Sequence, residues 1–210
     1  MRFPLSLGNV EDLLHDRGIE VSHETVRYWW QRFGPAFAAE IKKKRIAGGR
    51  TSKWPWHLDE VFVKINGKTH YLWRAVDHEG EVLESYVAKK RDKKAELKFV
   101  KNSMRKHGKS ERLTTDRLRS YGAALKEMKA EGVQECGRHL NTRIENSHLP
   151  FRRRERAMLR FRRMRSPQKF VSVQASVYNH FNLERTLTSR PIFKKNRSAA
   201  LAEWRSLGAA

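Results

Sequence analysis

Residues 56–67 read WHLDEVFVKING, an apolar stretch that a single aspartate interrupts. From Leu58 to Ile65 the side chains alternate between two faces, which is the period-2 pattern of a β-strand. The face that carries Asp59 also carries Val61, Val63 and Ile65. A carboxylate on a buried strand face costs free energy unless it is paired or binds a cation. Asp59 is therefore the first candidate for a functional residue.

The dipeptide Asn66-Gly67 at the end of this stretch predicts a two-residue hairpin turn, because both central positions of a type I′ turn need a positive φ. Residues 69–76 should then fold back as a second strand. Residues 77–80 have the composition of another turn, and residues 82–88 predict a third strand. The stretch therefore begins a three-stranded antiparallel meander.

A helix and a short strand are expected next. Asp92 can cap a helix that ends at Gly108, with Leu97, Val100 and Met104 on one face. Residues 112–116 then form a strand-like run that ends in Asp116. An acid at the carboxyl end of a sheet strand, directly before a helix, occupies a position where open sheets bind ligands. Taken alone, the position of Asp116 favours a simpler role as the N-cap of the following helix.

Helical spacing continues after Asp116 up to Gly132, and residues 133–136 predict one more short strand. The order of elements is three strands, a helix, a strand, a helix and a strand. Such an order predicts an α/β fold with a mixed sheet flanked by helices.

Residues 141–165 form an arginine-rich helical segment. From Arg138 to Arg165 the chain has ten arginines and only two acids, Glu145 and Glu155. An inner stripe is expected from Phe151, Met158 and Phe161. Pro150 should kink this segment or begin a second helix.

Three interpretations fit Glu145. It can pair with Arg143 or Arg152, lie exposed, or point into the same pocket as the two aspartates. His148 follows at i+3 and shares a face with Glu145 if the helix is continuous there.

The amino-terminal residues predict two short helices joined by a turn. Asn9 can cap the first helix, Gly18 follows it, and Ser22 can cap a second helix over residues 23–33. The second helix has an apolar stripe made of Val26, Trp29, Trp30 and Phe33. This is a helix-turn-helix pattern, in which outward-facing side chains enter a DNA groove. Those side chains are His23, Glu24, Arg27, Tyr28 and Gln31. An ordinary helical hairpin with a solvated polar face fits the same pattern.

The basic run from Lys42 to Arg45, followed by Ala47-Gly48-Gly49, has the composition of a linker, which places a domain boundary near residue 50. Residues 166–181 should add a packing helix, and residues 193–210 a short basic terminal helix.

The net charge is +22, from 45 Lys and Arg against 23 Asp and Glu. A field of one sign and this size favours a polyanionic partner, of which nucleic acid is the default. A solvated basic surface or a ribosome-like structural protein is the alternative. No apolar stretch approaches the ~20 residues that cross a bilayer, and no secretory signal is visible. The lone Cys136 fits a reducing cytoplasm, and the absence of zinc-binding motifs argues against zinc.

Several blocks of the sequence resemble one known family. These blocks are WHLDE around Asp59, YLWRAVDHEGEVL from Tyr71, TTDRLRSYGAAL around Asp116, and NTRIENSH followed by RRRERAM. In this order they are similar to the bacterial insertion-sequence transposases of the insertion sequence six family. The likeness runs from about Leu7 to about Phe181.

The resemblance implies an RNase H-like fold in which Asp59, Asp116 and Glu145 form a DDE triad and bind metal. Carboxylate oxygens suit Mg²⁺ or Mn²⁺, and two such ions about 4 Å apart can assist in-line displacement at phosphorus. Asn141 and His148 are expected to support this site. The implied domains are residues 1–50 with the helix-turn-helix and basic linker, residues 51–185 with the catalytic core, and residues 186–210 as a basic tail.

The resemblance also implies the partners. The helix-turn-helix would bind terminal inverted repeats of double-stranded DNA, and the protein would act on target DNA as a dimer or higher oligomer in the bacterial nucleoid. Arg152, Arg153 and Arg156 would hold the phosphate backbone. Trp54, Trp56, Tyr71 and Trp73 could stack on splayed bases, although core packing also fits them.

Two features depart from the family. The region before Asn9 is short, and 28 residues separate Asp116 from Glu145, fewer than is common there. We therefore retain two alternatives to a transposase. One is a truncated, catalytically silent DNA-binding repressor, and the other is a structure-selective nuclease of the same fold.

Overall fold

A computed structural model describes residues 3–47, 54–115, 125–126, 131–136, 142–158, 161–181 and 188–208. The chain divides into two compact units. Residues 49–172 form a sheet unit, and residues 1–48 together with 173–210 form a helical unit. Each unit is considered by itself. Within the described ranges, none of the helices combines the length and apolar character needed to cross a bilayer.

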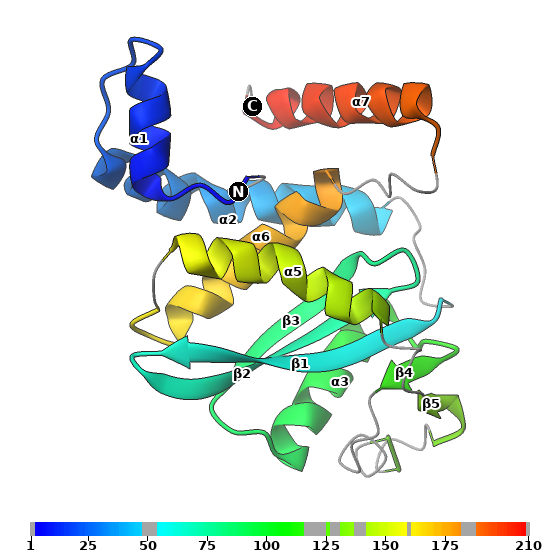
Figure 1. Cartoon of the computed structure of the whole chain (residues 1–210). Coiled ribbons are helices and arrows are strands. Elements are labelled where there is room, and N and C mark those ends of the chain that lie inside the picture. Colours follow the sequence, from blue (N-terminus) through cyan, green and yellow to red (C-terminus); the bar gives the residue numbers. More distant parts are fainter. Residues whose placement is uncertain are drawn as a thin grey trace. The chain divides into compact units, whose positions relative to one another are not determined.

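The sheet unit is built on a five-stranded sheet with the order β3-β2-β1-β4-β5 (Figure 1). Its strands are β1 Trp56–Ile65, β2 Lys68–Asp77, β3 Val82–Ala88, β4 Leu113–Thr115 and β5 Gln134–Cys136. The first three strands pair antiparallel, while β4 runs parallel to both β1 and β5. The predicted mixed five-stranded sheet with flanking helices is confirmed.

The hairpin turn forms as the sequence predicts. Asn66 has φ 49° and Gly67 has φ 76°, so both central residues lie in the left-handed region. Every residue of β1 pairs with one of β2, from Trp56 opposite Asp77 to Ile65 opposite Lys68. The two-residue turn therefore sets the register of the central hairpin.

Gly67→Ala is expected to lower the free energy of unfolding by roughly 1–2 kcal/mol, because an L-residue is strained at a left-handed φ. A methyl group at this position would meet no neighbouring atom within 4 Å, so the cost is purely conformational. Thermal unfolding measures it. Gly132→Ala is the matched control, since its methyl group is also unobstructed and its φ is not left-handed. Equal losses in both variants would contradict the prediction.

Two helices cover opposite faces of the sheet (Figure 1). Helix α3, Lys93–His107, is capped by Asp92 and ends at Gly108, as predicted. Its buried residues are Glu96, Phe99, Val100 and Ser103, a face slightly rotated from the one expected. Helix α5, Thr142–Ala157, packs on β1 and β2.

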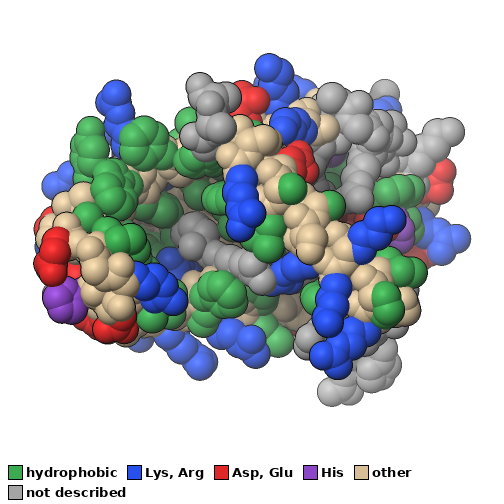
Figure 2. Space-filling model, turned by 90° about the horizontal axis from the view of Figure 1, so that it is seen from above, with side chains coloured by type: hydrophobic (Ala, Val, Ile, Leu, Met, Phe, Trp, Pro, Cys, Tyr) green, Lys and Arg blue, Asp and Glu red, His purple; other side chains and the backbone are tan. Residues whose placement is uncertain are grey.

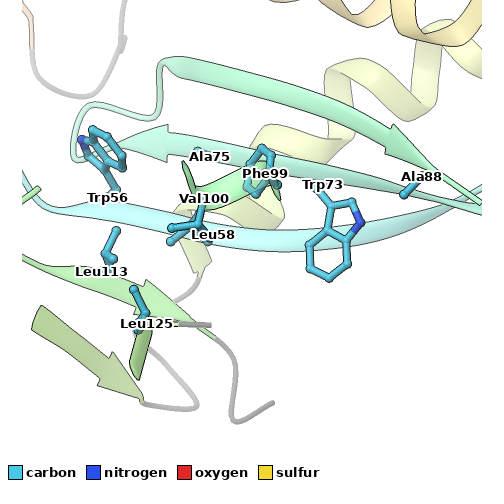
Figure 3. Close-up of a cluster of buried hydrophobic side chains, with 9 residues drawn as sticks. All are labelled: Trp56, Leu58, Trp73, Ala75, Ala88, Phe99, Val100, Leu113 and Leu125. Carbon is cyan, nitrogen blue, oxygen red and sulfur yellow. The ribbon is translucent and has the colours of Figure 1, made fainter. Parts of the chain in front are cut away.

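The core of the sheet unit lies between the sheet and α3 (Figure 3). Its fully buried members include Trp56, Leu58, Trp73 and Phe99. Because neighbouring residues of a strand point to opposite faces, Leu58 facing this core turns Asp59 toward the other side. That side is the one that α5 covers.

Pro150 lies inside α5, which continues to Ala157, so no second helix begins there. Of the expected inner stripe, Phe151 and Phe161 are buried, but Met158 is 37% exposed. Met158 is the last residue before the described chain breaks and lies beyond the end of the helix, so the helical spacing no longer governs its direction.

The helical unit contains α1 Leu7–His15, α2 His23–Ala47, the C-terminal part of α6 Arg165–Phe181, and α7 Arg190–Gly208. Ser6, rather than Asn9, is the N-cap of α1, and Asn9 completes a capping box with it. Ser22 accepts a hydrogen bond from the amide of Thr25 at the start of α2, as a cap does. Gly18 provides the turn between the two helices with φ 72°.

Helix α2 is much longer than the expected residues 23–33. The expected linker residues Lys42–Arg45 belong to its last turns, because the intervening Ala-rich sequence favours a helix. Its inward face is also different, since Ala38 and Ile41 are buried while Trp29 is 42% and Phe33 48% exposed.

The core of the helical unit joins segments that are distant in sequence. Ala38 of α2 packs with Val173, Val177 and Phe181 of α6, and Trp204 of α7 lies against them. Trp204 also stacks on Phe37 at 5.6 Å between ring centroids. The packing helix and the terminal helix are found as predicted, and the terminal helix begins at Arg190 and has 19 residues.

Candidate active site

Asp59 lies in the middle of the sheet unit. It belongs to β1, the central strand, and is half-buried. Its cross-strand partner on β2 is Arg74, which is 2% exposed. The preceding residue, Leu58, pairs with Thr115 on the parallel strand β4. The acid therefore lies where three strands of the sheet are hydrogen-bonded side by side.

Helix α5 places a histidine directly against this acid. Nε2 of His148 lies 3.2 Å from Oδ2 of Asp59, and His148 is 8% exposed. Burial lowers the pKa of His148, and the nearby positive charges of Arg74 and Arg152 lower it further, while the hydrogen bond and the charge of Asp59 act in the opposite direction. A neutral imidazole that donates its Nε2 proton to the carboxylate fits these conditions.

A second contact joins the same helix to β2. Nη1 of Arg74 donates a hydrogen bond of 2.6 Å to the backbone carbonyl of Ser147, and this contact is buried. Ser147 and His148 are consecutive on α5, while Arg74 and Asp59 face each other across two strands. Two neighbouring contacts therefore connect the helix to one cross-strand pair.

Glu145 lies in the first turn of α5, three residues before His148. The helix is continuous over both residues, which satisfies the condition for a shared face. The side chain is exposed. Arg152, one of its suggested partners, instead forms an ion pair with Glu155 at 2.5 Å. The exposed side chain of Glu145 fits the second interpretation, and its place three residues before His148 is compatible with the third. That Glu145 points into a pocket with the two aspartates stays a prediction.

Two of the expected site residues, Asp116 and Asn141, lie outside the described residues. The described chain ends at Thr115, directly before Asp116, and Thr115 is fully buried in β4. Among the residues that the structure does describe, no three His, Cys, Asp or Glu side chains form a group that could hold a metal ion. The gathering of three acids therefore remains a prediction.

The three expected backbone-binding arginines differ in their surroundings. Arg153 and Arg156 are exposed, whereas Arg152 is half-buried, pairs with Glu155, and lies 6.0 Å from the ring of Phe151. Arg153 and Arg156 are therefore accessible to a polyanion.

In the helical unit the five predicted groove-facing side chains, His23, Glu24, Arg27, Tyr28 and Gln31, are all exposed. His23 contacts Glu11 of α1 at 2.9 Å, and Arg27 pairs with Glu24 at 3.0 Å. Exposed pairs of this kind contribute little stability and separate easily. Figure 2 shows hydrophobic side chains gathered on the side of the view where α1 lies, and the exposed residues of this unit include Leu13, Tyr28 and Trp29.

The proposed stacking of four aromatic residues on bases is corrected for two of them. Trp56 and Trp73 are 2% and 0% exposed in the core beneath the sheet, so they cannot reach a ligand. Trp54 and Tyr71 are half-buried, and Trp54 makes an edge contact with His78. Core packing explains the two buried tryptophans.

Two residues of this site were not found from the sequence. Arg74 appears as one basic residue in an apolar run, and Ser147 contributes only a backbone carbonyl. The signal available for Arg74 was its place in the run YLWRAVD, where a charge interrupts an otherwise buried strand just as Asp59 does on the strand before it.

The sequence is similar to known transposases. A family model described as a DDE domain matches residues 53–184. The transposase for the insertion sequence-like element IS431mec of Staphylococcus aureus is 33% identical over 153 residues, which are 70% of this chain and 66% of that protein. The transposase for insertion sequence element IS257 in transposon Tn4003, also of Staphylococcus aureus, shows the same identity and coverage. This chain spans 66% of the length of both relatives.

Solved structures show a more distant likeness. The catalytic core domain of HTLV-2 integrase in complex with magnesium is 15% identical with a TM-score of 0.49, covering 69% of this chain and 98% of that chain. The catalytic domain of Mos1 mariner transposase is 12% identical with a TM-score of 0.41, covering 82% and 89%.

Proposed function

Because the chain belongs to the insertion sequence six family of DDE transposases, we propose that it is a DNA transposase that binds the ends of its element and catalyses metal-dependent strand cleavage and strand transfer. Asp59, Asp116 and Glu145 are the proposed catalytic acids. Asn141 and His148 are the proposed supporting residues.

The observation that carries this proposal is the contact between His148 and Asp59. It joins the first proposed acid, on the central strand, to the helix that carries the third. Glu145 lies one helical turn before His148, and the second acid follows Thr115, whose neighbour across the sheet is Leu58. Chain connectivity therefore supports a site made by these three acids on the face of the sheet that α5 covers.

The donor set fits a divalent cation. Carboxylate oxygens are hard ligands of the kind that Mg²⁺ and Mn²⁺ prefer, and the half-buried Asp59 keeps one oxygen apart from His148. When bound, one or two such ions would polarise the scissile phosphate and lower the pKa of an attacking hydroxyl. Within the protein, His148 would orient Asp59 by donating its Nε2–H hydrogen bond to Oδ2.

The positive charge of the chain supports a DNA substrate. Arg153 and Arg156 are exposed on α5, the helix that also carries Glu145 and His148, and would hold phosphates without reading sequence. The exposed side chains of α2, including Arg27 and Gln31, would contact the terminal inverted repeats. A complex on two element ends would contain at least two copies of the chain.

The function is tested with purified protein, Mn²⁺ or Mg²⁺, and a labelled DNA fragment that carries one element end. We expect the parent protein to nick the fragment and Asp116→Ala to leave it intact while still binding it in a gel-shift assay. Binding without nicking by the parent would favour a silent DNA-binding protein. Equal nicking by both proteins would remove Asp116 from the mechanism.

A structure-selective nuclease is separated by the substrate. Replacing the terminal repeat with random sequence of equal length is expected to abolish cleavage by a transposase. Undiminished cleavage of the random fragment, or preferential cleavage of branched DNA, would favour the nuclease instead.

A further inference from the structure

Arg74 is a buried cation in the sheet unit. It is 2% exposed and belongs to the antiparallel pair with Asp59, where opposite Cβ atoms are about 4.5–5.5 Å apart. Burying a charge is unfavourable unless hydrogen bonds and an opposite charge compensate for it. The surroundings of Arg74 must therefore supply both.

The hydrogen-bonding partner that α5 contributes is the carbonyl of Ser147, at 2.6 Å from Nη1. The opposite charge in direct register is Asp59. The ring of His148 contacts this carboxylate, with Nε2 3.2 Å from Oδ2 of Asp59, and His148 directly follows Ser147 on α5. Strand register thus places Arg74 opposite Asp59, and two consecutive residues of α5 contact this cross-strand pair, Ser147 at Arg74 and His148 at Asp59.

We infer that Arg74 is a positioning residue that serves as a resident counter-cation for Asp59 and holds α5 against the sheet when no divalent ion is bound. The inference rests on the proposed function, in which Asp59 is a metal ligand. Two cations near one carboxylate repel each other, so Arg74 should oppose metal binding while it stabilises the protein without metal.

The inference predicts a metal-dependent stability that changes with the charge at position 74. Thermal unfolding of the full chain is measured with and without MnCl₂. In Arg74→Gln the melting temperature without metal should fall, and the rise caused by Mn²⁺ should exceed that of the parent by at least about 3 °C. In Arg74→Lys, which keeps the charge, the rise should match the parent.

A matched control separates this effect from a general loss of positive charge. Lys106→Gln removes a cation on α3 that pairs with Glu84 at 2.5 Å. Helix α3 covers the face of the sheet opposite to α5 (Figure 1). Its Mn²⁺-induced rise should equal that of the parent. An Arg74→Gln rise no larger than the parent's would overturn the inference, because a purely structural role predicts equal rises.

A double substitution covers the case in which Arg74→Gln does not fold. If the two charges compensate each other, adding Asp59→Asn to Arg74→Gln removes the uncompensated acid, and the double variant should melt higher than Arg74→Gln alone. A double variant that is no more stable would overturn the inference.

Failure of the proposed function gives a different result. If Arg74→Gln shows the larger Mn²⁺-induced rise but the parent protein never cleaves DNA, the role of Arg74 is retained and the transposase proposal is lost. A parent that cleaves DNA while all variants respond equally to Mn²⁺ would do the reverse.

Discussion

Asp59→Asn is expected to lower the rate of metal-dependent strand cleavage by roughly 10³-fold or more, which corresponds to about 4 kcal/mol of transition-state stabilisation. Asparagine has the same shape and can still contact His148, but it carries no charge to neutralise a divalent cation. The measurement is single-turnover cleavage of a labelled element end, with circular dichroism to establish that the variant is folded.

Glu60→Gln is the matched control because Glu60 is the next residue of the same strand and points to the opposite face. Its side chain is 6% exposed and pairs with Arg91. We expect this variant to melt at a lower temperature, because a buried ion pair is broken, and to cleave at nearly the parental rate. Equal losses of cleavage in both variants would show that any acid on β1 matters only for folding.

Trp73→Ala is expected to lower the free energy of unfolding by about 3–5 kcal/mol, since it leaves a cavity in a close-packed core. Trp73 is 0% exposed and packs near Phe99 of α3, with 6.3 Å between ring centroids (Figure 3). For a chain of this size the melting temperature should fall by roughly 6–20 °C. Denaturant and thermal unfolding followed by circular dichroism measure both quantities.

Phe62→Ala tests whether the position, rather than the loss of an aromatic ring, causes this effect. Phe62 lies on the same hairpin but is 57% exposed. Its replacement should change the free energy of unfolding by no more than about 0.5 kcal/mol, as is usual for surface positions. Similar losses at both positions would mean that Trp73 is not a core residue in solution.

Local features of the fold followed from the sequence because a few neighbouring residues determine each of them. The Asn66-Gly67 turn needs only two left-handed residues, and the Asp92 cap and the Gly108 stop need only their own helix. The strand pattern around Asp59 was equally local. The resemblance of the blocks around the three acids to a known family, rather than these local signals, made them candidates for one site.

The helical unit shows where local signals failed. The spacing of Val26, Trp29, Trp30 and Phe33 indicated an inward stripe, yet Trp29 and Phe33 are exposed. The buried face of α2 is instead decided by residues of α6 and α7, more than 130 positions later, which pack around Ala38. A helix has several faces of similar apolarity, and only its partners select one.

The sequence by itself predicted which residues would carry the chemistry, namely an acid on the first strand of the meander, a second acid after a short strand and a third on a basic helix. Only the tertiary structure decided which side chains surround Asp59. Arg74 faces it because the hairpin register aligns two strands, and His148 contacts it because α5 packs on that face. Such contacts join residues up to 89 positions apart. Strand register and helix packing depend on the whole folded chain, so no pattern of neighbouring residues specifies them.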